Sequence, residues 1–261
     1  MKLATWNINS VRLRLPLLLR FAAEYLPDII CLQETKCPDE FFPATKLRAA
    51  GYTHQAIWGQ KSYNGVAILS RVPLTDIQTY ARCGKQDCRH LSAHLPGGAA
   101  LHNIYIPAGG YEADPIGNPK FQHKLDFVDE LAAWWPQQTA GAKILVGDLN
   151  IAPLEHDVWD SKKMQNVVSH TPIEREKFLA MQNSIDWIDS AREFTPHDQK
   201  LYSWWSYRAT DWDAANKGRR LDHIWVTPDL KSSLRGAHTP RDLRAWPQPS
   251  DHVPVILQIQ D

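Results

Sequence analysis

The stretch that most restricts the fold is the apolar run Ile144-Leu145-Val146, which is followed by a glycine and then by Asp148 and Asn150. Such a run, with no polar alternation, is typical of a strand that is buried on both faces. Asp148 and Asn150 are two residues apart, so in an extended chain their side chains point to the same side. A carboxylate beside a carboxamide suits hydrolysis of an anionic ester. An Asp/Asn turn that simply closes a strand is the alternative.

The first fifty residues predict alternating strands and helices. Residues 3–9 and 28–34 are expected to be strands, and a helix between them is expected to begin near Pro16 and end before Pro27. Strand, helix, strand is the pattern of an α/β fold. Residues 39–50 are expected to form a further helix that ends at Gly51.

The middle of the chain predicts antiparallel hairpins, because short strand-like runs follow one another without helices. These runs are residues 52–58, 65–70, 74–80, 89–95 and 100–106. Helices are expected over residues 119–135 and 173–183, and further strands over 201–207, 221–227 and 253–259. No linker, repeat or low-complexity tract interrupts the sequence, so residues 1–261 are predicted to form one domain.

Composition excludes some classes of protein. Lysine plus arginine and aspartate plus glutamate each number 29, so bulk charge does not indicate a nucleic-acid partner and any basic surface must be local. The four cysteines lack zinc-site spacing; Cys83 and Cys88 could pair, but nothing requires it. No signal peptide or membrane span is recognised, which favours a cytoplasmic protein with reduced thiols. The P-loop and GxSxG motifs are missing, so a nucleotide cofactor and an acyl-enzyme are disfavoured.

Polar residues recur where the apolar strands stop, and ligands collect beyond such strand ends in α/β sheets. The residues are Asn7, Asn9, Gln33, Glu34, Asp148, Asn150, Asp222, His223, Asp251 and His252. Each residue alone is weak evidence for a functional site, since Glu34 could be a solvated strand end and His252 could be a surface histidine. Together they offer carboxylates and amides without thiolates, which favours Mg²⁺ or Mn²⁺ over zinc.

Seven motifs, in this order, resemble those of the exonuclease III family. They are Trp6-Asn7-Ile8-Asn9-Ser10, Leu32-Gln33-Glu34-Thr35-Lys36, Tyr63-Asn64-Gly65-Val66-Ala67-Ile68-Leu69-Ser70-Arg71, Asn103-Ile104-Tyr105-Ile106-Pro107, Gly147-Asp148-Leu149-Asn150-Ile151-Ala152-Pro153, Arg220-Leu221-Asp222-His223-Ile224 and Ser250-Asp251-His252-Val253-Pro254. The resemblance covers nearly the whole chain, from Trp6 to Pro254.

This resemblance implies a four-layer α/β sandwich, with two packed mixed β-sheets flanked by helices. It also implies a Mg²⁺-dependent phosphodiesterase of base-excision repair. Such an enzyme acts on double-stranded DNA, cleaves 5′ to abasic sites, and removes 3′-blocking groups or 3′-terminal nucleotides. We expect this protein to be a monomer.

The resemblance also implies residue roles. Glu34 would bind the metal, with Asn7, Asn9 and Asp251 nearby, and Asp148 and Asn150 belong to the same ligand set. Asp148 would activate water, and Asn150 and Tyr105 would contact the phosphate. His252, oriented by Asp222, would stabilise charge on the phosphoryl group. How the base and metal roles divide among the carboxylates stays open.

Residues 202–208 resemble the specificity strand of the family. Trp204 and Leu221 would wall a pocket that admits a base-less sugar and rejects a nucleotide that carries its base. Arg208, Lys217, Arg219 and Arg220 would supply local positive charge for DNA phosphates. The alternative is an aromatic core strand beside a solvated basic surface.

The chain departs from the family at Ala108, where several members have an amide, and at Arg219, where some are apolar. These departures leave the balance between abasic cleavage and 3′ trimming open. Two rival functions also stay open. One is a phosphoesterase of the same fold acting on an inositol phosphate or a sphingolipid head group. The other is a decayed relative that binds RNA or protein.

Overall fold

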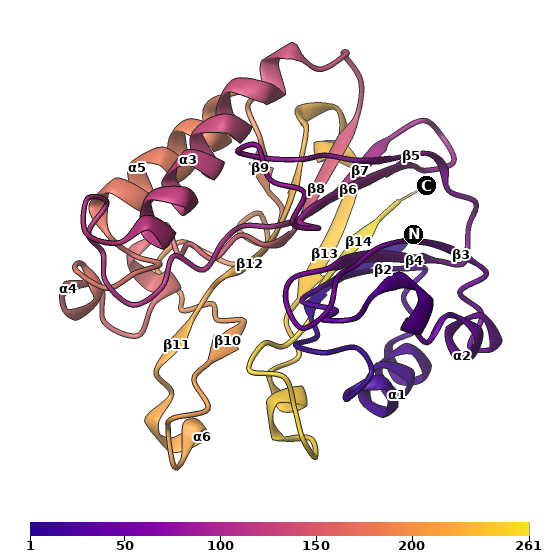
Figure 1. The fold of residues 1–261 in the computed structure, drawn as a ribbon, viewed down its shortest axis with the longest axis horizontal. Coiled ribbons are helices and arrows are strands. Elements are labelled where there is room, and N and C mark those ends of the chain that lie inside the picture. Colours follow the sequence, from indigo (N-terminus) through magenta and orange to yellow (C-terminus); the bar gives the residue numbers. More distant parts are fainter. Residues whose placement is uncertain (261) are drawn as a thin grey trace.

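The computed structural model describes residues 1–260 and contains two six-stranded mixed sheets that pack face to face (Figure 1). The first sheet has the order β13 (Leu234–His238), β14 (Val255–Ile259), β1 (Lys2–Asn7), β2 (Ile29–Gln33), β4 (Val66–Ser70) and β3 (His54–Trp58). The second has the order β5 (Thr75–Thr79), β6 (His90–His94), β7 (Ala100–Tyr105), β8 (Lys143–Asp148), β12 (Asp222–Val226) and β9 (Ile188–Asp189).

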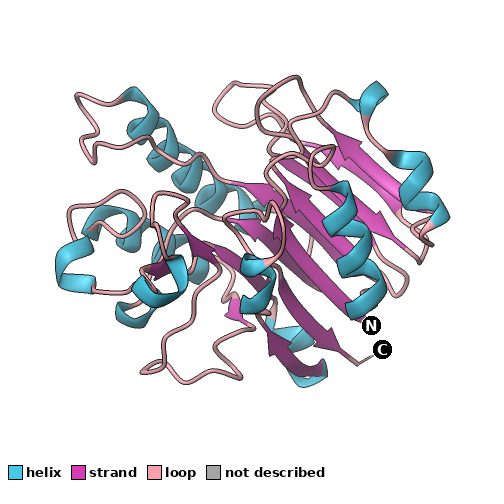
Figure 2. Ribbon diagram, turned by 90° about the horizontal axis from the view of Figure 1, so that it is seen from below, coloured by secondary structure: helices cyan, strands magenta, loops and turns pink. Residues whose placement is uncertain are grey.

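Helices cover the outer face of each sheet, so the predicted four-layer α/β architecture is confirmed (Figures 1 and 2). On the first sheet these are α1 (Leu15–Tyr25) and α2 (Ala44–Ala49); on the second they are α3 (Pro119–Trp134) and α5 (Pro172–Asn183). The shorter helical segments are η1 (Asp39–Phe41), η2 (Trp135–Gln137), η3 (Glu155–Asp157), α4 (Ser161–Met164), α6 (Trp212–Ala215), η4 (Pro228–Ser233) and η5 (Arg241–Ala245).

The buried apolar strands explain this layering. In β8, Ile144 and Val146 belong to the core between the two sheets, whereas Leu145 belongs to the core beneath the outer helices. In β2, Ile29 and Cys31 face the other sheet in the same way. Successive side chains of a strand point to opposite faces, so a run without polar residues fills two cores at once.

The strand directions bring the predicted site residues to one edge. Each sheet contains one parallel pair, β1 with β2 and β7 with β8, and the carboxyl ends of these strands lie at the same side of the molecule. In the second sheet β12 runs antiparallel to β8, so Asp222 pairs directly with Asp148. The loop before β14 delivers Asp251 and His252 to the same edge.

Some predicted elements differ from those observed. The helix expected over residues 39–50 is split into η1 and α2 at Pro43, because a proline has no N–H for a continuous helical hydrogen-bond ladder. The strand expected over residues 201–207 shrinks to β10 (Trp204–Trp205), which pairs with β11 (Gly218–Arg219). The strands β9, β11 and β13 were not predicted, and the first two have only two residues each.

Two further findings concern the whole described chain. Across residues 1–260, every helix is too short or too polar to cross a membrane. All four cysteines, including Cys83 and Cys88, are free thiols.

Candidate active site

Asp148 lies at the end of β8 and is only 1% exposed. Its Oδ2 atom accepts hydrogen bonds from the side-chain amides of Asn7 (2.8 Å) and Asn150 (3.2 Å). Gly147 is required just before it, because a Cβ atom there would stand 1.8 Å from the main-chain oxygen of Ile104. Burial raises the pKa of Asp148 because the charged carboxylate loses its solvation. A carboxylate whose pKa is moved toward neutrality suits proton abstraction from water.

His252 stands beside Asp148 and is oriented by Asp222. Its Nδ1 is 2.8 Å from Oδ2 of Asp222, and its Nε2 is 3.7 Å from Oδ2 of Asp148. The hydroxyl of Ser203 donates to the same Asp222 oxygen at 2.6 Å. Burial by itself would lower the pKa of His252, but the carboxylates of Asp222 and Asp148 outweigh burial and raise this pKa. The imidazole is therefore stabilised as a cation next to Asp148.

Glu34 follows β2 and is linked to both sheets. Its Oε1 accepts from the amide of Asn7 (3.0 Å) and from the hydroxyl of Tyr105 (2.8 Å), and its Oε2 pairs with the ammonium of Lys36 at 2.7 Å. Burial favours the protonated acid, but Lys36 and the two hydrogen bonds outweigh burial and lower the pKa of Glu34. Because the amide of Asn7 also donates to Asp148, it joins the two carboxylates.

Asn9 extends this hydrogen-bond array to the loop before β14. Its amide donates to Asp251 at 3.1 Å, and its side-chain oxygen accepts from Lys36 at 2.7 Å. The ring N–H of Trp204 donates to the other carboxylate oxygen of Asp251 at 3.0 Å. Residues from both sheets and from the β10–β11 hairpin are therefore joined in one array.

Two groups of donors could be considered for a metal ion. The first is Asp148, Asp222 and His252, whose ligand atoms lie within 4.8 Å of one another. A protonated histidine has no lone pair to offer a metal, and the raised pKa of His252 therefore makes this group a poor site.

The second group surrounds Glu34 and fits a hard divalent cation better. Its donors are carboxylate and amide oxygens, the ligands that Mg²⁺ and Mn²⁺ prefer. The ammonium of Lys36 bonds to oxygens of Glu34 and Asn9, so a positive charge is already accommodated among them. The residues of this group are Glu34, Asn7, Asn9 and Asp251.

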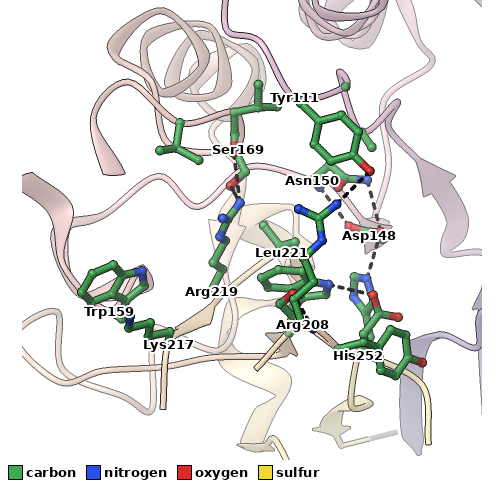
Figure 3. A pocket seen from close by; sticks show the side chains of 18 of the residues that line it. Tyr111, Asp148, Asn150, Trp159, Ser169, Arg208, Lys217, Arg219, Leu221 and His252 are labelled. Atoms are coloured by element: carbon green, nitrogen blue, oxygen red, sulfur yellow. Dashed lines mark hydrogen bonds and ion pairs between the residues drawn. The ribbon is translucent and has the colours of Figure 1, made fainter. Parts of the chain in front are cut away.

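A cavity of about 630 Å³ opens over these side chains (Figure 3). Glu34, Asp148, Asn150, Asp251 and His252 form its polar part. Its walls include Trp204, Leu221, Arg208, Lys217, Arg219, Trp159 and Tyr111. The structure therefore brings Asp148, Asn150, His252 and most of the predicted specificity residues to one cavity. Asp222 and Tyr105 do not line it, but they bond to His252 and Glu34, which do.

Arg219 is held firmly in the cavity wall. Its Nη1 donates to the main-chain oxygen of Val168 (3.1 Å) and to the hydroxyl of Ser169 (3.0 Å), and its guanidinium lies 4.9 Å from the ring centre of Trp204. In Figure 3 its side chain points from β11 toward Ser169. Its Nε–H is buried and finds no acceptor within residues 1–260.

Arg220 does not belong to this surface, and its predicted contact with DNA is wrong. It is 1% exposed and bonds to both oxygens of Asp157 (2.8 and 2.9 Å) and to Asp189 (2.6 Å). Neighbouring residues of an extended chain point to opposite sides, so Arg219 faces the cavity while Arg220 enters the interior.

Two other polar strand-end residues lie away from the site. Gln33 is fully buried and donates to Asn103 at 2.7 Å, within the layer where the two sheets meet. His223 is fully buried and bonds to the main-chain oxygen of Ile151 at 2.9 Å.

Sequence reasoning missed Lys36, Ser203 and Tyr111 as site residues. Lys36 was visible only as part of a motif, and Ser203 has no chemistry of its own apart from orienting Asp222. Tyr111 is 86% exposed and bonds to Arg208 across the cavity at 3.5 Å (Figure 3). It falls in a segment with poor resemblance to the family, so no motif marked it.

Comparison with known proteins defines the class. The family model described as "Endonuclease/Exonuclease/phosphatase family" matches residues 4–252 of this chain. The chain therefore belongs to the endonuclease/exonuclease/phosphatase family, and it is a nuclease of that family.

Individual relatives indicate the activity more narrowly than the family does. The chain is 31% identical to exodeoxyribonuclease III of Haemophilus influenzae over 273 residues, with all of both chains covered. It is 29% identical to an exodeoxyribonuclease of Bacillus subtilis over 266 residues, with 99% of both covered. These relatives and the solved structures below support a DNA-repair function of the abasic (AP) endonuclease and 3′-exonuclease type, as the sequence predicted.

Two solved structures share the fold over the full length of both chains. One is the 3′ phosphatase NExo from Neisseria bound to a product DNA hairpin, with a TM-score of 0.92 and 32% identity. The other is an AP endonuclease from Archaeoglobus fulgidus, with a TM-score of 0.92 and 29% identity.

Proposed function

We propose that this nuclease hydrolyses duplex DNA on the 5′ side of abasic sites and removes 3′-phosphates and 3′-terminal nucleotides. One observation carries the proposal. Asp148 and the His252–Asp222 pair lie together at the polar end of a cavity whose walls are aromatic, apolar and basic. A hydrolytic group and a selective pocket are thus next to each other.

Asp148 takes the proton from the attacking water. Two features support this role, namely the pKa that burial raises and the amides of Asn7 and Asn150, which fix its carboxylate. A general base works best when its pKa lies near the working pH.

The phosphate is held by neutral and cationic donors. Asn150 and Tyr105, whose donors bond to Asp148 and Glu34 in the absence of DNA, turn to the phosphate oxygens when DNA binds. The imidazolium of His252 stabilises the charge that develops on the phosphoryl group. Burial raises the pKa of Tyr105, as do the carboxylates of Glu34 and Asp148, so its hydroxyl stays protonated and acts as a donor. Asp222 keeps His252 charged and oriented.

Glu34, with Asn7, Asn9 and Asp251, holds the metal, and Mg²⁺ is preferred, with Mn²⁺ as a substitute. Such an ion supplies Lewis-acid stabilisation of phosphate charge when it is bound. An excess of chelator should abolish activity, and Mg²⁺ should restore it. Glu34→Ala should raise the Mg²⁺ concentration needed for half-maximal rate while DNA affinity changes little.

The cavity wall selects the substrate. Trp204 and Leu221 receive the base-less sugar, and the guanidinium of Arg219, which lines the same cavity, grips a 3′-phosphate. Arg208 and Lys217 line the same cavity and supply positive charge for flanking phosphates. This local charge reconciles DNA binding with a formal net charge of zero.

We also propose that the protein works as a monomer in the cytoplasm. All four cysteines are free thiols, which is compatible with a reducing compartment. Light scattering of the protein with and without a DNA duplex would detect a dimer.

The deciding experiment uses three duplexes that share one sequence. One carries an abasic site, one a 3′-phosphate and one a plain recessed 3′ end, each incubated with and without Mg²⁺. Metal-dependent cleavage of the first two is the expected result. Cleavage of an inositol phosphate or a sphingolipid head group in place of the three duplexes would refute the proposal.

A further inference from the structure

Lys124 of α3 and Glu174 of α5 form a buried ion pair next to the main chain of Asn150. Both side chains are fully buried, and the ammonium lies 2.5 Å from a carboxylate oxygen. Removing two charges from water costs more than their attraction returns, unless their other hydrogen-bonding groups are satisfied as well. The partners that satisfy them therefore indicate what the pair does.

The ammonium of Lys124 ties two loops together. Besides Glu174, it donates to the main-chain oxygens of Asn150 (2.7 Å) and Ala108 (3.5 Å). Gly109 permits this close approach, since it has a φ of +86° and a Cβ atom there would lie 2.9 Å from Cδ of Lys124. Lys124 thus connects the loop after β8 with the loop after β7.

The carboxylate of Glu174 reaches the cavity wall. Its two oxygens accept from the main-chain N–H of Ser169, each at 2.9 Å, and Oε2 also accepts from Thr171, the residue that caps α5. The hydroxyl of Ser169 accepts from Arg219. Glu174 therefore fixes Ser169, and Ser169 in turn bonds to Arg219.

The backbone at both tethered residues is strained. Asn150 has a φ of +54° and Ser169 a φ of +90°, in the left-handed region that residues other than glycine rarely adopt. Such conformations persist where the surrounding structure fixes them. Here Lys124 fixes the carbonyl of Asn150, and Glu174 fixes the N–H of Ser169.

We propose that Lys124 and Glu174 are a positioning pair that couples hydrolysis to substrate choice. Lys124 sets the place of Asn150 at the phosphate, and Glu174 sets the place of Arg219 in the pocket through Ser169. The inference rests on the proposed function for the roles of Asn150 and Arg219. It adds that one buried contact between two outer helices controls both.

Two single variants test the two arms. Lys124→Met should lower kcat on all three duplexes by about tenfold or more, because Asn150 serves every substrate, and it should also shift the substrate ratio, because Glu174 loses its partner. Glu174→Gln should change the ratio of 3′-phosphate removal to abasic cleavage by about threefold or more, in the direction that Arg219→Ala changes it.

The double variant Glu174→Gln/Arg219→Ala gives the sharpest test. If Glu174 acts through Arg219, the double variant should show the same ratio as Arg219→Ala alone. An unchanged ratio in well-folded Glu174→Gln, or independent multiplication of the two effects, would overturn the proposal.

The control is the ion pair of buried Arg82 with half-exposed Glu130. Arg82 also bonds to His90, and all three residues lie outside the cavity lining. Arg82→Met should lower Tm but leave kcat, KM and the substrate ratio of the folded enzyme unchanged. A shift in the substrate ratio here would mean that any buried charge loss perturbs the site, and the positioning role would fall.

Amide hydrogen exchange gives a readout that needs no substrate. In Glu174→Gln, exchange should quicken at Ser169 and its neighbours, whereas in Arg82→Met it should not. If wild-type protein cleaves none of the duplexes, the proposed function fails while exchange still tests the tether. If exchange at Ser169 is unchanged in Glu174→Gln, the tether itself is refuted.

Discussion

At the scale of single residues, three carboxylates within one array are given different chemistry by their neighbours. Burial raises the pKa of Asp148, whereas Lys36 and two hydrogen-bond donors lower the pKa of Glu34. Asp222 is buried against His252, whose pKa it raises. These different environments support the proposed roles of Asp148 as the base, Glu34 as a metal ligand and Asp222 as the group that orients His252.

Replacing Asp148 tests the base directly. Asp148→Asn keeps the shape but cannot accept a proton, so kcat on the abasic duplex should fall by about 10²–10⁴-fold. Single-turnover measurements at saturating DNA would isolate this step. Near-normal turnover would remove Asp148 from the role.

The pair of His252 and Asp222 should behave as one unit. His252→Ala and Asp222→Ala should each lower kcat, and the double variant should be hardly worse than the poorer single variant. A double-mutant cycle on kcat would show this coupling, and simple multiplication of the two losses would contradict it.

The pH profile of kcat should report the same pair. The Asp222 charge raises the pKa of His252, so the active imidazolium persists into alkaline solution and is lost as pH rises through that pKa. Asp222→Asn removes this charge, and the alkaline limb should move to lower pH by about 1–3 units. An alkaline limb that stays in place would show that another group controls it.

At the scale of elements, the buried strands were predictable from the sequence, whereas the β10–β11 hairpin was not. Strands such as β2 and β8 can be recognised in the sequence from their own runs of apolar residues. The aromatic run at residues 201–207 predicts a long strand, but only two residues pair, and the hairpin that bears α6 projects away from the sheets (Figure 1). The shape of the hairpin depends on contacts between residues that are far apart in the sequence. For example, Tyr202 packs against Gly218, where a Cβ atom would be 2.4 Å from the Tyr202 ring.

Trp204 tests what this hairpin does. A base-less sugar leaves the helix easily, so its cleavage depends on the wall that receives it, and trimming of a plain 3′ end depends on that wall less. Trp204→Ala should therefore lower kcat/KM on the abasic duplex more than on the recessed end. Equal losses on both duplexes would indicate that Trp204 only packs against its neighbours.

At the scale of the whole molecule, sequence motifs located the residues of the site but not what holds them. The motif residues lie at strand ends, and two packed sheets bring these ends together. Lys124 and Glu174 lie outside any motif, and Ser203 lies in the specificity strand without a role that the sequence could show, because the importance of all three comes from what they touch after folding. Arg219 and Arg220 are identical residues side by side in the sequence, and only the fold sends one to the cavity and the other to Asp157.

Acid stability should depend on two histidines buried beneath η2 and the end of α3. His90 and His102 bond to each other at 3.0 Å against Trp134 and Trp135. Burial is the main cause that lowers the pKa of His102 to about 3 and that of His90 well below its ordinary value of 6.5. Both are therefore neutral in the folded protein at neutral pH.

The sign of the effect follows from proton binding. Between pH 6.5 and about 3 the unfolded chain binds protons at these histidines and the folded protein does not, so stability falls as pH falls through that window. The loss is on the order of a few kcal/mol. His102→Gln cannot be protonated, so its free energy of unfolding, from urea denaturation between pH 4 and 7, should depend less steeply on pH, by about one proton. An equally steep dependence in the variant would mean that His102 takes up its proton without unfolding the molecule.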